Sequence, residues 1–161
     1  MLVSYATRSL VLSRLDYSNS LLVNVSRMDI ERLQRIQNRA AKIVFKARKH
    51  DRATPLLKEL HWLPVEKRIS YKVALIVFKC MHKIAPGYLI SLLSMPHRSN
   101  YGLRSSKDTL YLNIPRVDSK KGEASFDFCG PKTWNNLPYE LRSSISIESF
   151  RKKLKTYLFS L

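Results

Sequence analysis

The stretch PVEKRISYKVALIVFKCMHK, residues 64–83, decides the fold of this 161-residue chain. Pro64 is suited to open a helix, and every position from Val73 to Met81 except Lys79 is apolar. A helix that is apolar on nearly all sides belongs at the centre of a core. We therefore expect a helix from Pro64 to about Lys83, with the other helices up to Leu93 packed around its apolar half.

Upstream of this stretch, the apolar spacing predicts more helices. Ser26, with Asp29 three residues later, is suited to cap a helix from Arg27 to about Lys46. Its apolar stripe consists of Ile30, Leu33, Ile36, Ala40, Ile43 and Val44. The segment from Leu2 to Val23 predicts one long helix or two short ones, with any break near Asp16. Thr54 and Pro55 predict the start of a short helix that continues through Leu60.

Downstream, the regular pattern is interrupted and then resumes. Residues 88–93 predict a short helix, residues 95–108 a polar and basic loop, and TLYLNIPRV, residues 109–117, a β-prone extended segment. Residues 121–136 predict a short helix and a turn of the chain that is rich in aromatic residues. Ser146 is suited to cap a final helix. The large aromatic residues are expected to anchor the core, namely Trp62, Phe126, Phe128, Trp134 and Phe150.

These elements predict a mainly α protein. We expect an irregular multi-helix bundle with at most one short β segment and a smaller C-terminal lobe, unless this last third packs back onto the first part. The expected organisation is a helical region over residues 1–94, a basic loop with a short extended segment over 95–118, and a C-terminal helical lobe over 119–161.

The composition indicates a globular protein with an anionic partner. Hydrophobic residues make up 45% of the chain, and 29 Lys and Arg against 12 Asp and Glu give a formal net charge of +17. No apolar run approaches the roughly 20 residues of a membrane-spanning helix, and Arg8 and Arg14 interrupt the N-terminal apolar stretch, which argues against a signal peptide. Cys80 and Cys129 do not form a disulfide framework, so an intracellular location is expected.

The positive charge is most ordered on the helix predicted over residues 27–46. Five cations follow one another at intervals of 3, 4, 3 and 4 residues, within an arc of ~80° and over roughly 21 Å, which suits a row of phosphates. They are Arg32, Arg35, Arg39, Lys42 and Lys46. Two weaker candidate sets are Arg68, Lys72 and Lys79 on the apolar helix, and Arg151, Lys152 and Lys155 on the last one. Each set is also open to the simpler interpretation of a solvated helix face.

The residue patterns of common catalytic sites are missing from the sequence. Polymerases and nucleases need carboxylates that share metal ions, and the chain has no adjacent Asp or Glu pair. It has no CxxC pair, its four His are scattered, and its four Gly form no phosphate-binding loop. We expect no catalytic residue, no metal site and no cofactor in this chain.

Several motifs resemble the C-terminal portion of reverse transcriptases from jockey-like non-LTR retrotransposons, which are long interspersed elements. The motifs are DIERLQRIQNRAAKIV, ELHWLPVEKRI and WNNLP, in this order and spacing. The resemblance implies that the chain begins after the polymerase palm and that its first helices correspond to a thumb-like region beside the template–primer duplex. It also implies that the parent is an RNA-directed DNA polymerase with an endonuclease domain and a need for Mg²⁺. The chain would then be either a truncated copy of the element or a genuine short product.

Together, the residues and the resemblance predict a non-catalytic fragment that grips nucleic-acid phosphates without reading sequence. The expected partners are RNA and DNA, with an RNA–DNA hybrid favoured, and the upstream reverse-transcriptase domain. The expected location is the nucleus, a cytoplasmic ribonucleoprotein, or both. The alternative is a helical protein-interaction module that docks on the missing palm or another protein. A membrane-surface role is disfavoured, because the basic residues do not flank an exposed apolar face.

Overall fold

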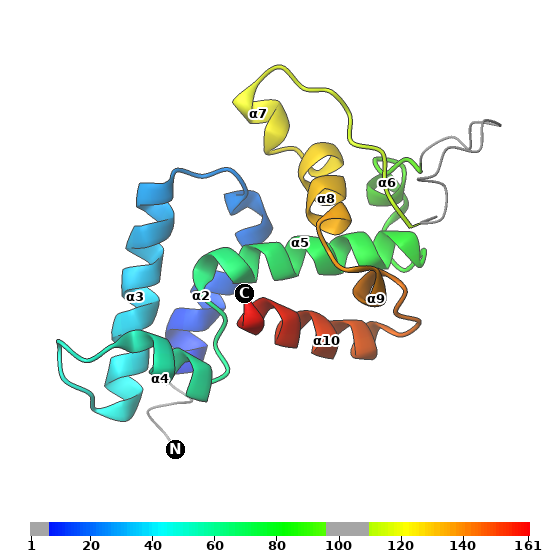
Figure 1. Ribbon diagram of the computed structural model, residues 1–161. Coiled ribbons are helices and arrows are strands. Elements are labelled where there is room, and N and C mark those ends of the chain that lie inside the picture. The colour runs from blue at the N-terminus through cyan, green and yellow to red at the C-terminus, as the bar shows by residue number, and fades with distance from the viewer. Residues whose placement is uncertain (1–6, 96–109) are drawn as a thin grey trace. The chain divides into compact units, whose positions relative to one another are not determined.

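The computed structural model describes residues 7–95 and 110–161, and it builds them mainly from helices, with no β-strand among these residues (Figure 1). The mainly α fold expected from the sequence is confirmed. The chain divides into two compact units, Met1–Ser70 with Leu158–Leu161, and Tyr71–Tyr157. This division differs from the expected regions 1–94, 95–118 and 119–161, because the boundary between the units falls inside the apolar helix.

The first unit begins with short helical turns. They are the π-helical turn η1 (Arg8–Leu12), α2 (Ser13–Asp16) and the 3-10 turn η2 (Asn19–Leu22). The expected break near Asp16 is confirmed, since α2 ends there and Ser18 adopts a left-handed backbone with φ 49°. Two longer helices follow, α3 (Arg27–Phe45) and α4 (Ala53–Glu59).

The core of the first unit lies where η1, α3 and α4 meet. Its buried members are Leu12, Ala40, Ala41, Leu57 and Trp62. α3 contributes two small alanines to this cluster, whereas Leu57 and Trp62 contribute larger side chains. Trp62 is thus a core anchor, as expected.

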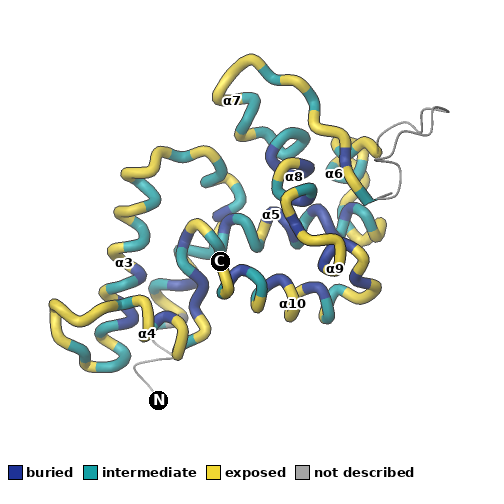
Figure 2. Tube along the Cα trace, viewed as in Figure 1, coloured by how far each residue is buried: buried dark blue, intermediate teal, exposed yellow. Residues whose placement is uncertain are grey.

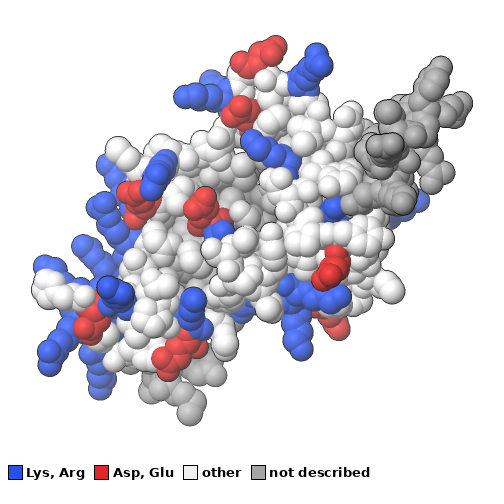
Figure 3. Space-filling model, in the orientation of Figure 1, with Lys and Arg blue, Asp and Glu red and all other residues white. Residues whose placement is uncertain are grey.

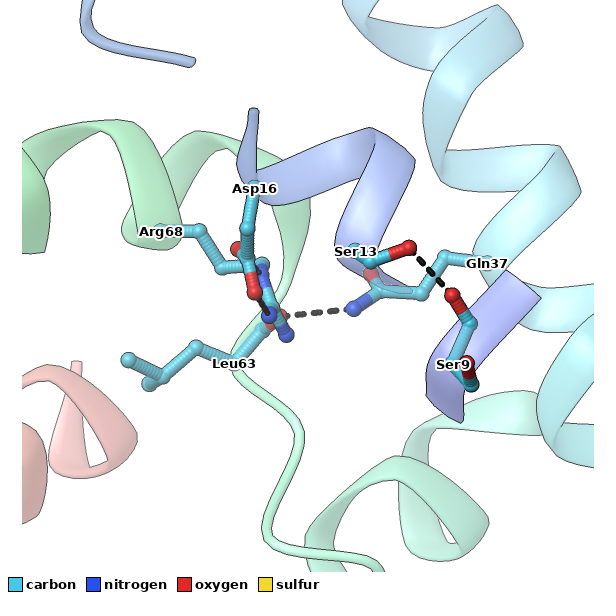
Figure 4. A network of polar contacts seen from close by, with 6 residues as sticks. All are labelled: Ser9, Ser13, Asp16, Gln37, Leu63 and Arg68. Atoms are coloured by element: carbon cyan, nitrogen blue, oxygen red, sulfur yellow. Dashed lines mark hydrogen bonds and ion pairs between the residues drawn. The ribbon is translucent and has the colours of Figure 1, made fainter. Parts of the chain in front are cut away.

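Polar contacts fix the connection between α4 and α5 (Val65–Met81). The fully buried Gln37 donates from Nε2 to the carbonyl of Leu63 at 2.8 Å, and Gln34 Oε1 accepts from the backbone N–H of Val65 at 2.8 Å. Figure 4 shows Gln37 with Leu63, and beside them the ion pair between Asp16 and Arg68. These contacts satisfy backbone groups that would otherwise be buried without partners.

Two predicted helix starts need correction. α4 begins at Ala53, with Arg52 as its N-cap, so Thr54 and Pro55 lie inside its first turn. Pro55 lacks a backbone N–H, but the N–H groups of a first turn have no partner within the helix, so no hydrogen bond is lost. α5 begins at Val65 rather than Pro64. Pro64 flanks the helix, and its carbonyl accepts the first helical hydrogen bond, from Arg68 N at 2.9 Å. α5 ends at Met81, before Lys83 turns left-handed with φ 56°.

The second unit is built around the apolar half of α5. Its further helices are α6 (Gly87–Ile90), α7 (Lys120–Glu123), α8 (Phe126–Asn135), α9 (Tyr139–Arg142) and α10 (Ile147–Ser160), the last of which belongs to this unit up to Tyr157. Ser146 caps α10 as predicted, accepting from Ser149 N at 3.2 Å. The region 121–136 forms two helices rather than one, and α9 was not expected.

Aromatic side chains fill the core of the second unit. Phe78 stacks on Phe150 with 4.3 Å between ring centroids, and Trp134 lies 5.8 Å from Phe150. A Cβ atom at Gly130 would lie 3.2 Å from Val77 Cγ2, so α8 and α5 pass close together. The apolar half of α5 is therefore covered by α8 and α10, which corrects the expectation that the helices up to Leu93 surround it. Figure 2 shows the buried residues of α5 and α10.

Part of the predicted β segment is described, and it forms no strand. Residues 111–118 have no regular secondary structure. Asn135 instead holds this segment, since its side chain accepts from Leu112 N at 2.9 Å and donates to Leu112 O at 2.8 Å. Trp134 Nε1 donates to Leu110 O at 2.7 Å. One amide side chain thus makes the pair of bonds that a neighbouring strand would make. Most of the predicted basic loop, at 96–109, lies outside the described residues.

Candidate nucleic-acid interface

Helix α3 carries the main candidate site, and its ends are fixed by local hydrogen bonds. Ser26 accepts from Asp29 N at 3.2 Å, which is the predicted N-cap. At the other end, Lys46 N donates to Ile43 O and Ala47 N donates to Lys42 O at 2.9 Å. This is a Schellman ending, in which Lys46 takes the left-handed position with φ 51°.

The predicted row of cations exists as one face of α3. Arg32, Arg35, Arg39 and Lys46 are exposed, and Lys42 is half-buried. Figure 3 shows Lys and Arg side chains gathered on the side of the molecule where α3 lies in Figure 1. The row is therefore open to solvent, as contact with a polyanion requires.

The C-terminal half of the row borders a hollow of about 620 Å³. Its lining consists of Arg35, Asn38, Arg39, Lys42, Ile43, Lys46, Ala47 and Lys49. Five of these eight residues are cationic and none is acidic. Such a concentration of positive charge is destabilising by self-repulsion and attracts counterions or anionic ligands.

Two details of α3 go beyond what helical spacing predicts. Arg32, the first cation of the row, is paired, since its Nη1 lies 3.2 Å from Asp29 Oδ1. Two members of the apolar stripe, Ile36 and Ile43, have exposed side chains. Both isoleucines lie at the edge of the stripe, next to the cations, where the neighbouring elements do not cover them.

In the second candidate set, on α5, one of the three cations is already engaged by a carboxylate. Arg68 makes a two-pronged contact with Asp16, with Nε at 2.7 Å from Oδ1, and its side chain is only 15% exposed. This guanidinium holds α2 to α5 rather than facing solvent. Lys72 is exposed and Lys79 half-buried.

The third candidate set lies on α10. Arg151 and Lys152 are exposed and Lys155 is half-buried. Arg151 Nε lies 3.5 Å from the hydroxyl of Tyr71, and this hydrogen bond raises the pKa of Arg151 above its usual value. The guanidinium is thus partly engaged within the second unit.

Two free cysteines, Cys80 and Cys129, are the thiols of the described residues. Within that part of the chain, no group of three or more His, Cys, Asp or Glu side chains could hold a metal ion. Burial raises the pKa of the Cys80 thiol, and burial together with the charge of Asp127 raises that of Cys129. Both side chains are buried, at 3% and 6% exposure. No helix in the described ranges is long and apolar enough to cross a membrane.

Comparisons with protein families, with curated proteins and with solved structures give no significant match to this chain. The resemblance to retrotransposon reverse transcriptases therefore stays a prediction based on the sequence motifs.

Lys49 is the residue of this surface that the sequence interpretation missed. It lies in the segment RKHDRAT, residues 48–54, which connects the two helices predicted on either side and is polar and basic. The signal was present as a continuation of basic residues beyond the helix, at Arg48, Lys49 and Arg52. Their relation to the row depends on how the chain turns after Phe45, which helical spacing does not reveal.

Proposed function

We propose that this chain binds nucleic acid through the cationic face of α3, as a non-catalytic element of an RNA-directed DNA polymerase of the non-LTR retrotransposon type. The observation that carries the proposal is the hollow beside α3, which is lined by five cations and no carboxylate. The motif resemblance supplies the polymerase context, and catalysis would be left to a palm domain that needs Mg²⁺.

Phosphate contact is the chemistry that this surface favours. Each Lys or Arg that neutralises a phosphate releases condensed counterions, so binding weakens as salt increases. Such contacts fix the position of a protein on a nucleic acid and carry no direct sequence information. The surface is therefore suited to hold any sequence, as a polymerase must while its template moves.

A salt titration tests the proposal. The full chain is titrated with a labelled RNA–DNA hybrid over a range of salt concentrations, and log K is plotted against log salt. The triple variant Arg35→Ala, Arg39→Ala and Lys46→Ala should reduce the slope by about 2.7 units, because each phosphate contact contributes about 0.9. These three side chains are exposed, so the fold should survive, which circular dichroism checks.

The matched control removes three exposed cations from the second unit, by Arg116→Ala, Lys121→Ala and Lys153→Ala. Its net charge falls by the same amount, so any general effect of charge is equal in the two variants. We expect the control to keep nearly the full slope. Binding that is independent of salt, or an equal loss in the control, would contradict the proposal.

A protein-interaction module is the second candidate, and exposed apolar side chains favour it. Ile84, Tyr88 and Leu92 follow one another at four-residue intervals around α6 and are 62%, 70% and 46% exposed. Apolar surface of this kind often marks contact with another protein. The same titration separates the two functions, because apolar association does not weaken steeply as salt increases.

A further inference from the structure

The charge of the α3 row is not uniform along the helix. At its start, Arg27 Nε lies 3.2 Å from Glu31 Oε1, and Arg32 Nη1 lies 3.2 Å from Asp29 Oδ1. Beyond Glu31, neither α3 nor the hollow contains a carboxylate. Arg32 therefore differs from the later cations of the row, since its charge is already compensated by a neighbour.

The chain beyond α3 turns back towards the row. After the left-handed Lys46, Ala47 N donates to Lys42 O, and Lys42 Nζ donates to the carbonyl of Lys49 at 2.6 Å. This last bond ties the connector to the last turns of α3. Lys49 consequently lines the same hollow as Arg35, Arg39 and Lys42, although it is outside the helix.

We infer that the binding site is a cradle made of Arg35, Arg39, Lys42, Lys46 and Lys49, in which Lys49 contacts the ligand and Arg32 does not. The ligand is one sugar–phosphate backbone of a nucleic acid, contacted from the helix on one side and from the connector on the other. Arg35 and Lys46 are about 16 Å apart along the axis, enough for several consecutive phosphates. This inference rests on the proposed function and makes its site more specific.

The apolar part of the hollow agrees with a backbone ligand. Ile43 is 62% exposed and lies within the hollow, beside Ala47. A sugar–phosphate backbone carries apolar ribose faces between its charges, so an isoleucine among cations can pack against a sugar while the cations bind the phosphates. An inorganic anion would gain nothing from this side chain.

Two single variants with equal charge change test the inference. Lys49→Ala and Arg32→Ala each remove one exposed cation from the full chain, and the carbonyl that Lys42 bonds is kept in Lys49→Ala. With the RNA–DNA hybrid as probe, Lys49→Ala should reduce the salt slope by about 0.9. Arg32→Ala should leave the slope unchanged, and Lys49→Arg should restore it.

The outcomes separate this inference from the proposed function. If wild type binds in a salt-dependent way and Arg32→Ala reduces the slope as much as Lys49→Ala, the cradle is wrong while the proposed function stands. If wild type binds without salt dependence, both are wrong. A selective loss in Lys49→Ala, with restoration by Lys49→Arg, supports the cradle.

Discussion

Lys46 occupies a backbone position that usually belongs to glycine. Its φ of 51° places it in the left-handed region, at the end of a Schellman motif, where a Cβ atom costs free energy. Lys83 takes the same place after α5, with φ 56°, and Ile84 N donates to Lys79 O at 2.9 Å. Both helices thus end on a lysine rather than on the residue with the lowest strain.

Replacing Lys46 by glycine should change stability and binding in opposite directions. Lys46→Gly should raise the free energy of unfolding by about 1 kcal/mol, because it relieves the left-handed strain. It should also weaken binding to the RNA–DNA hybrid and reduce the salt slope by about 0.9, since one cradle cation is lost. Urea unfolding and the salt titration measure the two effects.

Lys83→Gly is the matched control for this prediction. It relieves the same kind of strain at the end of α5 but lies outside the cradle, so stability should rise while the salt slope stays at the wild-type value. A fall in stability for Lys46→Gly would show that the lysine side chain makes a stabilising contact that outweighs its strain.

At the residue scale, the sequence predicted features that depend on neighbouring residues better than features that depend on how the chain turns back on itself. Ser26 and Ser146 were recognised as caps, because a cap and the N–H it accepts from are three residues apart. The row on α3 was recognised for the same reason, since helical spacing alone defines a face. Lys49 was missed because its place depends on a left-handed turn at a lysine, which no turn rule based on glycine predicts.

At the scale of elements, α3, α5 and α10 were predicted to within a few residues because their apolar periodicity is strong. The extended segment was harder, because its β-prone alternation resembles that of a strand. Its backbone is bonded mainly by side chains rather than by a strand, since Asn135 satisfies both groups of Leu112 and Trp134 Nε1 donates to Leu110 O. Sequence alternation indicates a segment that needs backbone partners, but not where those partners come from.

Removing the Asn135 amide should destabilise the second unit. Asn135→Ala leaves the N–H and the carbonyl of Leu112, a residue only 3% exposed, without these bonds, at a cost of about 2 kcal/mol or more. Asn136→Ala, at the exposed amide next along the chain, should stay within about 0.5 kcal/mol of wild type. Urea unfolding of both variants checks the comparison, and equal losses would contradict the role of Asn135.

At the scale of the whole molecule, each compact unit has its own core and its own tryptophan. Trp62 belongs to the core with Leu12, Ala41 and Leu57 in the first unit, and Trp134 to the aromatic core of the second. The first core contains small alanines and a buried glutamine, whereas the second stacks large rings. Because buried apolar area sets stability, the second unit should be the more stable one.

Tryptophan fluorescence should therefore change in two steps during urea unfolding. The first step reports the first unit through Trp62, and the second reports the second unit through Trp134. Trp62→Phe should abolish the first step and leave the second, reported by Trp134, at its original midpoint. A single step in the wild type that keeps its midpoint in the variant would show that the two units unfold together.

The uneven charge of α3 has a further consequence for the ligand-free protein. Aligned peptide dipoles give a helix a partial positive charge at its N-terminus and a partial negative charge at its C-terminus. Asp29 and Glu31 stand at the positive end of α3, and Lys42 and Lys46 at the negative end. The helix macrodipole thus offsets part of the repulsion among the cations, so the cradle can keep its shape between one ligand and the next.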